Sequence, residues 1–288
     1  MAYDLDPRAL HRHDPRSAAY DEFMLARIPG ARHAAPGDAF GFAAVPYPVT
    51  PPHGGSRGRG WPLLADDLFR LAHRDSTGAP LLDPYVAGLG LSAALLGELL
   101  LTGHLTVRNG LVEVTVRSPP SDVLAHTVLD QLVSEREDHP VRTWLAYLGR
   151  STSEEVAGRL QRAGHLRTEM SRRIFTRTVR HVPTDMNTAA WPWARLSRLL
   201  RRGDPLDDFD TLLGGLAVAT DLHRVVLIGE ADAFASALRP LIAQAAEPFR
   251  ELITHTRAAA GDAVITKTQH LTRPSRVGGE RAPRSAPG

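Results

Sequence analysis

The sequence has 288 residues, of which 43% are hydrophobic and 23% are charged, and its formal net charge is +2. This composition is too apolar for a wholly disordered chain and indicates a globular protein with at least one sizeable core. The chain contains no cysteine, which excludes disulfides, thiolate metal sites and cysteine nucleophiles and favours a reducing cytoplasm. No apolar run reaches the roughly 18 residues of a membrane span, and the N-terminus lacks the apolar stretch of a signal peptide.

Composition divides the chain into three parts. Residues 1–60 are rich in Pro, Gly, Ala and His without sustained periodicity, and residues 259–288 combine prolines and paired glycines with an excess of basic residues. We therefore expect a disordered arm and a disordered basic tail. Residues 61–258 have only short gaps between periodic segments, so they are predicted to form one folded domain.

The domain is predicted to begin with two helices. Apolar residues recur at helical spacing over residues 63–72, and a second, more apolar segment covers residues 84–101. The second helix carries its own boundary signals. Asp83 can cap its first turn, Pro84 suits the first helical position, and Gly103 favours a left-handed ending.

The remaining elements follow from the same kinds of signal. Asn109-Gly110 between apolar runs is typical of a hairpin with a type I′ turn, and a second hairpin is predicted across residues 167–182. Further helices are predicted over residues 122–135, 141–149, 154–163, 188–202, 207–222 and 231–258, the last with candidate breaks at Pro240 and Pro248. The predicted fold class is mainly α, a single helical domain with two small β-hairpins.

One motif with a chemical meaning is set aside because of its context. Gly88, Gly90 and Ala93 satisfy the relaxed dinucleotide-binding fingerprint, and Glu113 lies where the ribose-binding acid is expected. The fingerprint requires a preceding buried strand, whereas the residues before Gly88 begin a helix, so we interpret the small residues as a close packing surface. The 13 histidines form no metal-binding pattern, and no serine lies in a nucleophile elbow. We expect no cofactor, no metal site and no catalytic residue, and hence not an enzyme.

The charge is segregated along the chain. Residues 172–202 contain eight arginines against the single acid Asp185. In the predicted hairpin, apolar residues including Ile174 and Phe175 are interleaved with these arginines, and Trp191 and Trp193 follow. Basic side chains beside aromatic ones suit an anionic membrane surface. A solvated helical face with buried tryptophans is the alternative interpretation. The eight arginines are Arg172, Arg173, Arg177, Arg180, Arg195, Arg198, Arg201 and Arg202.

The order and spacing of several short motifs resemble the Golgi phosphoprotein 3 family, also called GPP34. The motifs are Leu64-Ala65-Asp66-Asp67-Leu68, Asp75-Ser76-Thr77-Gly78, Gly90-Leu91, Leu95 to Leu101 with Gly103-His104-Leu105, Ser118 to Leu124, Val141 to Leu145, Leu160 to Leu166, Pro183-Thr184, and Asp204-Pro205 with Leu212-Leu213. The resemblance covers most of residues 61–230. It implies a mainly helical domain that binds phosphatidylinositol 4-phosphate and contacts membranes through the hairpin after Leu166.

The resemblance also assigns site residues. It implies a lipid-headgroup site near Asp83, Ser92, Arg150 and Ser153, and a membrane-contact hairpin that includes Arg172, Arg173, Ile174, Phe175, Arg177 and Arg180. Of the four headgroup positions only Arg150 is basic, and arginine is the usual partner of a phosphomonoester. The family's hairpin is also more apolar than residues 172–182 of this sequence, which favours electrostatic docking over insertion.

The sequence therefore predicts a non-enzymatic, cytoplasmic protein at the inner face of a membrane. Its expected partners are anionic phospholipid headgroups and client proteins, while the oligomeric state is left open. The alternative is a nucleic-acid-binding regulator, because a helix followed by a glycine and a hairpin is also the local pattern of a winged helix. That alternative needs an exposed recognition helix, and residues 154–163 offer only Arg159, Gln161 and Arg162 for this role. We therefore consider nucleic acid the less favoured partner.

Overall fold

The computed structural model describes residues 63–135, 137, 139–173, 176–227 and 229–272. Contacts divide the chain into residues 1–60 and 61–288, and all described residues belong to the second unit. The predicted arm over residues 1–60 and the last part of the predicted tail, residues 273–288, lie outside the described residues. Ile174 and Phe175 of the predicted membrane-contact hairpin also lie outside them.

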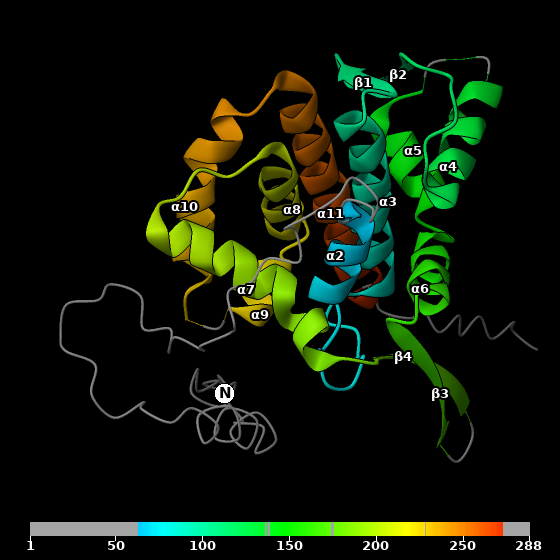
Figure 1. Ribbon diagram of the computed structural model, residues 1–288, viewed down its shortest axis with the longest axis vertical. Coiled ribbons are helices and arrows are strands. Elements are labelled where there is room, and N and C mark those ends of the chain that lie inside the picture. The colour runs from blue at the N-terminus through cyan, green and yellow to red at the C-terminus, as the bar shows by residue number, and fades with distance from the viewer. Residues whose placement is uncertain (1–62, 136, 138, 174–175, 228, 273–288) are drawn as a thin grey trace, which may run out of the picture. The chain divides into compact units, whose positions relative to one another are not determined.

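A single apolar helix, α3 (Pro84–Leu101), forms the centre of the domain. It packs against α2 (Leu64–Leu71) and against helices that come before and after the second hairpin in the chain (Figure 1). Every residue from Val86 to Leu100 is buried. By length and composition α3 could cross a membrane, contrary to the expectation that no segment would pass that test. Its burial against protein identifies it as the core helix of the domain instead.

The local signals around α3 act as predicted. The Asp83 carboxylate accepts a hydrogen bond from the Tyr85 backbone N–H at 3.0 Å, and Pro84 occupies the first turn. Gly103 has a φ of 73°, which ends the helix in a left-handed residue. Gly88 and Gly90 lie in mid-helix and not after a strand, so the fingerprint is a packing surface, as interpreted above.

Helices from the two halves of the domain lie on opposite sides of α3 (Figure 1). One side is formed by α4 (Val123–Ser134), α5 (Val141–Leu148) and α6 (Thr152–Arg162). The other side includes α2, α8 (Asp208–Ala219) and α11 (Glu247–Thr272). Farther from α3 are α7 (Met186–Arg202), the short α9 (Leu222–Val226) and α10 (Ala231–Gln244). The mainly helical fold with two hairpins is thus confirmed.

The two predicted hairpins are both present. Strands β1 (Leu105–Arg108) and β2 (Leu111–Val114) pair antiparallel around Asn109 and Gly110. Both turn residues have positive φ, 54° and 74°, as a type I′ turn requires. Strands β3 (Leu166–Arg173) and β4 (Thr176–Pro183) form the second hairpin, with Leu166 opposite Pro183 at its base.

The C-terminal helices differ from the prediction of one segment over residues 231–258. Pro240 lies inside α10 without ending it, and Ala245 adopts an extended conformation that separates α10 from α11. Pro248 lies in the first turn of α11, where its missing N–H breaks no helical hydrogen bond. Helix α11 then continues to Thr272, so the residues from 259 to 272 are helical and not a disordered tail, and Ala260 among them is buried.

Candidate functional site

Two glycines bring α3 against the junction between α5 and α6. A Cβ atom on Gly88 would lie 2.3 Å from the carbonyl oxygen of Gly149, so the close approach requires glycine. One turn farther along α3, the Ser92 hydroxyl donates to the Gly88 carbonyl oxygen at 2.8 Å. The same hydroxyl lies 3.2 Å from that of Thr152, the first residue of α6. These contacts hold residues 149–153 beside the first half of α3.

The four headgroup positions implied by the resemblance do not converge on one exposed surface. Ser92 is fully buried and bonded within the protein, so it acts here as a packing residue that no headgroup in solvent can reach. The Asp83 carboxylate caps α3 and lines a groove formed with the C-terminal helices. Only Arg150, which is exposed, and Ser153, which is half-buried, share the solvent side of the α5–α6 junction.

The β3–β4 hairpin extends away from the helical body, at the opposite end from β1 and β2 (Figure 1). Met170 and Val179 lie opposite each other in its register and are 58% and 54% exposed. Two positions nearer the turn, Arg172 lies opposite Arg177, and Arg173 follows next to them. An exposed apolar pair is thus followed by directly opposed arginine positions.

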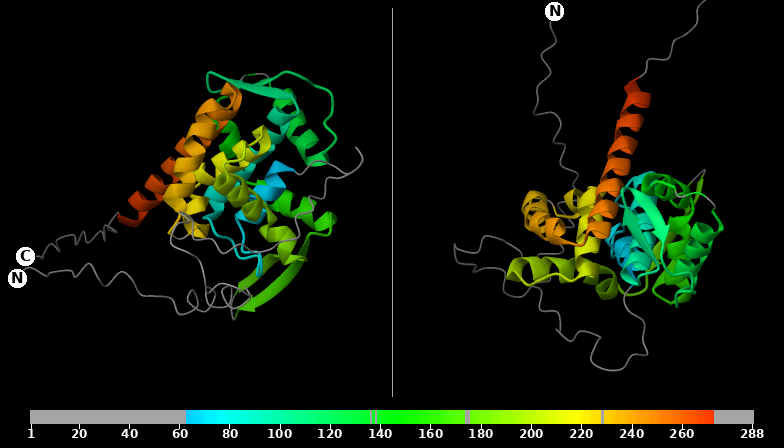
Figure 2. Two further views of the ribbon diagram at one scale, coloured as in Figure 1. Left: turned by 60° about the vertical axis from the view of Figure 1, so that its left-hand side comes forward. Right: turned by 90° about the horizontal axis from the view of Figure 1, so that it is seen from above.

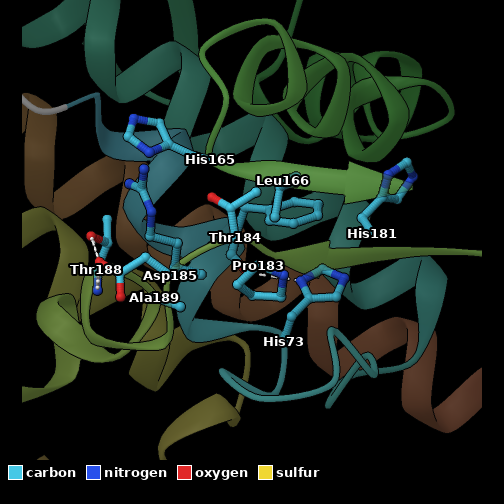
Figure 3. A pocket seen from close by; sticks show the side chains of 11 residues that line it. His73, His165, Leu166, His181, Pro183, Thr184, Asp185, Thr188 and Ala189 are labelled. Atoms are coloured by element: carbon cyan, nitrogen blue, oxygen red, sulfur yellow. Dashed lines mark hydrogen bonds between the residues drawn. The ribbon is translucent and has the colours of Figure 1, made fainter. Parts of the chain in front are cut away.

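The base of this hairpin encloses a cavity of about 20 Å³ that is lined by three histidines, His73, His165 and His181 (Figure 3). The loop after α2 packs tightly here, since a Cβ on Gly78 would lie 1.9 Å from the His181 carbonyl oxygen. Ligand pockets usually occupy several hundred Å³. The cavity is therefore too small for a phospholipid headgroup. The residues around it pack the base of the hairpin against the helical body.

One histidine at the hairpin base, His73, is held in a setting that disfavours charge. His73 stacks on Phe69 with ring centroids 4.0 Å apart, and its Nδ1 lies 2.8 Å from the Phe69 carbonyl oxygen. Burial lowers the pKa of His73, and the nearby His181 lowers it further, although the hydrogen bond to Phe69 opposes the shift. His181 Nε2 lies 3.5 Å from a carboxylate oxygen of Glu154 on α6.

The arginines of α7 divide into two groups. Arg195 faces inward, with Nε donating to Asp210 at 2.8 Å and Nη1 donating to Asp67 at 3.2 Å. Arg198 lies over the Trp191 ring at 5.9 Å, and Trp193 packs edge-on against Phe234. Arg195 and Trp193 therefore contact other parts of the protein, while Arg201 and Arg202 at the end of α7 are exposed.

A buried ionic cluster around Arg159 escaped the sequence analysis. The guanidinium donates to Asp66 at 2.8 Å, to both oxygens of Glu98 at 3.0 and 3.1 Å, and to Asp122 at 2.9 Å. Burial raises the pKa of Glu98, and Arg159 opposes that shift. For Arg159, burial alone would lower the pKa, but the carboxylates around it outweigh burial and raise it. A lone acid in an otherwise apolar helix, Glu98, was the available signal of a buried partner.

This cluster explains two features of the sequence. Asp66 and Asp67 of α2 bind different arginines, Arg159 of α6 and Arg195 of α7, so adjacent acids tie α2 to both halves of the domain. The nucleic-acid alternative needs an exposed recognition helix. Because Arg159 is buried, only Gln161 and Arg162 of its three candidate residues are exposed. Among the residues that the structure describes, no group of three His, Asp or Glu side chains could hold a metal ion.

The comparison with known families agrees with this architecture. The model of the Golgi phosphoprotein 3 (GPP34) family matches residues 64–256, from the start of α2 into α11. This chain belongs to the GPP34 family. No curated protein matches the sequence. The GPP34 family is not known as a family of enzymes, and membership favours a soluble cytoplasmic protein. The matched range takes in both hairpins and both acids of α2, and ends within α11.

Proposed function

We propose that this GPP34 protein is a peripheral membrane adaptor, not an enzyme, that binds anionic phospholipid headgroups at the cytoplasmic face of a membrane. Family membership supports this assignment, since the resemblance implies phosphatidylinositol 4-phosphate binding and membrane contact by the hairpin after Leu166. The observation that carries the proposal is the β3–β4 register, in which two arginine positions lie directly opposite each other on a hairpin outside the helical body.

Charge repulsion between the opposed arginine positions would destabilise the hairpin, and an anionic surface would relieve that repulsion. Like charges directly opposite each other on a hairpin destabilise it, by roughly 0.2–1 kcal/mol. Beside an anionic membrane each arginine instead contributes about 1 kcal/mol of attraction. The exposed pair Met170 and Val179 provides apolar contact with the interface next to those charges. The hairpin is therefore suited to docking on a membrane by charge.

Recognition by charge is favoured over a specific headgroup pocket. The burial of Ser92 and the helix-capping role of Asp83 leave Arg150 and Ser153 as the headgroup residues of this proposal. One arginine supplies at most one bidentate pair of hydrogen bonds, and these positions contain no second cation to balance the nearly two negative charges of a phosphomonoester. We expect binding to depend on the total negative charge of the membrane and only weakly on phosphatidylinositol 4-phosphate.

Vesicle flotation tests this function. Replacing Arg172, Arg173 and Arg177 by Ser should abolish flotation with phosphatidylglycerol vesicles, because it removes the opposed charges at the hairpin. Raising the salt concentration to about 0.5 M should do the same to the unmodified protein, since screening then acts over a few ångströms. Phosphatidylcholine vesicles should not bind at all.

A matched control keeps the change in charge constant. Arg108, Arg117 and Arg142 lie on or next to elements at the opposite end of the domain (Figure 1), and their replacement by Ser should leave flotation unchanged. Equal loss in both triple variants would attribute binding to net charge alone and contradict a role of the hairpin. Binding that resists salt and requires phosphatidylinositol 4-phosphate would contradict recognition by charge.

A further inference from the structure

A long groove lies between the start of α3, the end of α8, and helices α9, α10 and α11. Its volume is about 1030 Å³. The walls are largely apolar, and the groove is formed by different residues from those of the β3–β4 hairpin. Its apolar residues include Leu81, Val86, Val218, Val225, Ile242 and Ile253.

Four arginines line this groove. Arg224 of α9 is engaged by the carboxylates of Asp221 and Asp232 at 3.3 and 3.8 Å. The other three are Arg239 of α10 and Arg250 and Arg257 of α11, and within the described part of the chain they form no ion pair.

The acids of the groove are already engaged. Asp83 caps α3 and Asp221 pairs with Arg224, so the lining of the groove carries four arginines against two acids. The Arg250 guanidinium is held in place by donating to the Ala243 carbonyl oxygen at 3.0 Å. The groove therefore presents positive charge on two walls, from α10 and from α11.

The spacing of these groups along α11 matches a helical partner. Arg250 and Arg257 are two turns apart on one helix, and apolar groove residues continue beyond them to Ile265, which is 57% exposed. At 1.5 Å per residue, the stretch from Arg250 to Ile265 spans about 22 Å, the length of a helix of about 15 residues. The C-terminal end of α11 projects beyond the neighbouring helices (Figure 2).

We propose that the groove binds an acidic amphipathic helix of a partner protein. The apolar walls would cover the partner's apolar stripe, and Arg239, Arg250 and Arg257 would pair with acidic residues at its edges. A single lipid headgroup is held by basic groups that converge on it, whereas these arginines are spread along two walls. The open shape and length of the groove also fit a helix better than an enclosed small ligand.

Fluorescence anisotropy with a designed peptide tests the proposal. The probe is a labelled helical peptide whose leucines repeat at positions i, i+3, i+4 and i+7 and are flanked by glutamates. The full chain should bind it saturably. Arg239→Ser with Arg257→Ser should weaken binding roughly tenfold, since the variant loses two exposed ion pairs to the acidic residues of the peptide. Ile265→Asp should also weaken binding, because it places a charge against the apolar stripe.

Controls separate this site from general charge attraction and from the hairpin. The pair Arg117→Ser and Arg202→Ser, from other surfaces, should bind the peptide normally, as should the Arg172, Arg173 and Arg177 triple variant. Each variant should also keep its melting temperature. Failure of the full chain to bind, or equal binding of a scrambled peptide without the leucine stripe, would overturn the proposal. Loss of phosphatidylglycerol vesicle flotation in the groove variants, with peptide binding intact, would assign the groove to lipid.

Discussion

At the residue scale, the electrostatics of the domain centre on Arg159. Its guanidinium satisfies three carboxylates that come from α2, α3 and the N-cap of α4, and it is only 8% exposed. Burying a charge destabilises the folded state unless opposite charges and hydrogen bonds compensate for the lost hydration. Removing one partner from a buried ionic cluster therefore destabilises the fold, because it leaves a buried charge unpaired. Arg159 is therefore a structural residue, although it lies on a helix with an exposed basic end.

Replacing Arg159 by Met should destabilise the domain by about 3–5 kcal/mol, because Glu98 would remain buried without a cation and Asp66 would keep only the electrostatic influence of Arg70. Burial already raises the pKa of both carboxyls. The folded state therefore binds more protons than the unfolded state, and the deficit should shrink as the pH falls toward the raised pKa values. Urea unfolding at neutral and at mildly acidic pH measures both effects.

Arg162→Met, on the exposed side of the same helix, is the control and should change stability by less than about 0.5 kcal/mol. A loss of similar size in both variants, or a deficit in Arg159→Met that does not vary with pH, would show that the cluster does not contribute as argued.

At the element scale, the base of the β3–β4 hairpin packs around a small cavity that three histidines line. His73 is half-buried, stacks on Phe69 and faces the same small cavity as Arg70, His165, His181 and Asp185. The loop after α2 and strand β4 are pressed together there, as the position of Gly78 requires. A charge on His73 would be poorly solvated and close to His181 and Arg70.

The stability of the hairpin base should therefore fall in acid. Because the folded pKa of His73 is below its unfolded value of 6.5, the unfolded state binds more protons as the pH drops through that value, and unfolding becomes easier. His73→Gln removes this titration while keeping a polar side chain. Its melting temperature should fall less than that of the unmodified protein between pH 7.5 and pH 5.5, conditions that bracket the usual range of histidine.

Two comparisons make this measurement specific. His126→Gln, at a side chain that is 41% exposed and outside this cavity, should keep the pH dependence attributed to His73. His223 is also buried, and burial lowers its pKa, so His73→Gln together with His223→Gln should flatten the profile further. An unchanged profile in His73→Gln would mean that the hairpin base tolerates a charged histidine.

At the scale of the whole domain, one core connects the helices of both halves. The core runs from Leu64 in α2 to Ile253 in α11, with α3 in contact with helices on each side. The end of α11 extends this core, since Ala260 is 5% exposed and Asp262 pairs with Arg142 of α5. The folded unit therefore continues past residue 258, where the sequence placed its end.

Two truncations test the extent of this unit. A fragment of residues 61–272 should keep the melting temperature of the full chain, because the residues it lacks have no sustained apolar periodicity that could add to the core. A fragment of residues 61–258 should melt several degrees lower, since it loses the Ala260 packing and the ion pair to Arg142. For a domain of this size, about 1 kcal/mol corresponds to roughly 2–4 °C. Calorimetry that gave equal melting temperatures for both fragments would contradict the role of residues 259–272.

The sequence by itself determined the order and type of almost every element, because those features depend on neighbouring residues. Asp83, Pro84 and Gly103 set the ends of α3, and Asn109-Gly110 set the first turn, through bonds and backbone angles within a few positions. The family could be recognised from the sequence for the same reason, since its motifs follow these local features in order.

Tertiary structure alone decided which side chains face protein and which face solvent. Helix α3 is apolar on all sides, so its periodicity could not reveal that Ser92 faces Thr152 or that Glu98 meets Arg159, 61 residues away in the chain. The length of α11 and the arginine groove beside it likewise depend on contacts with distant helices. Hydrophobic periodicity reports that a face is buried, but the partner that buries it is chosen by packing across the whole domain.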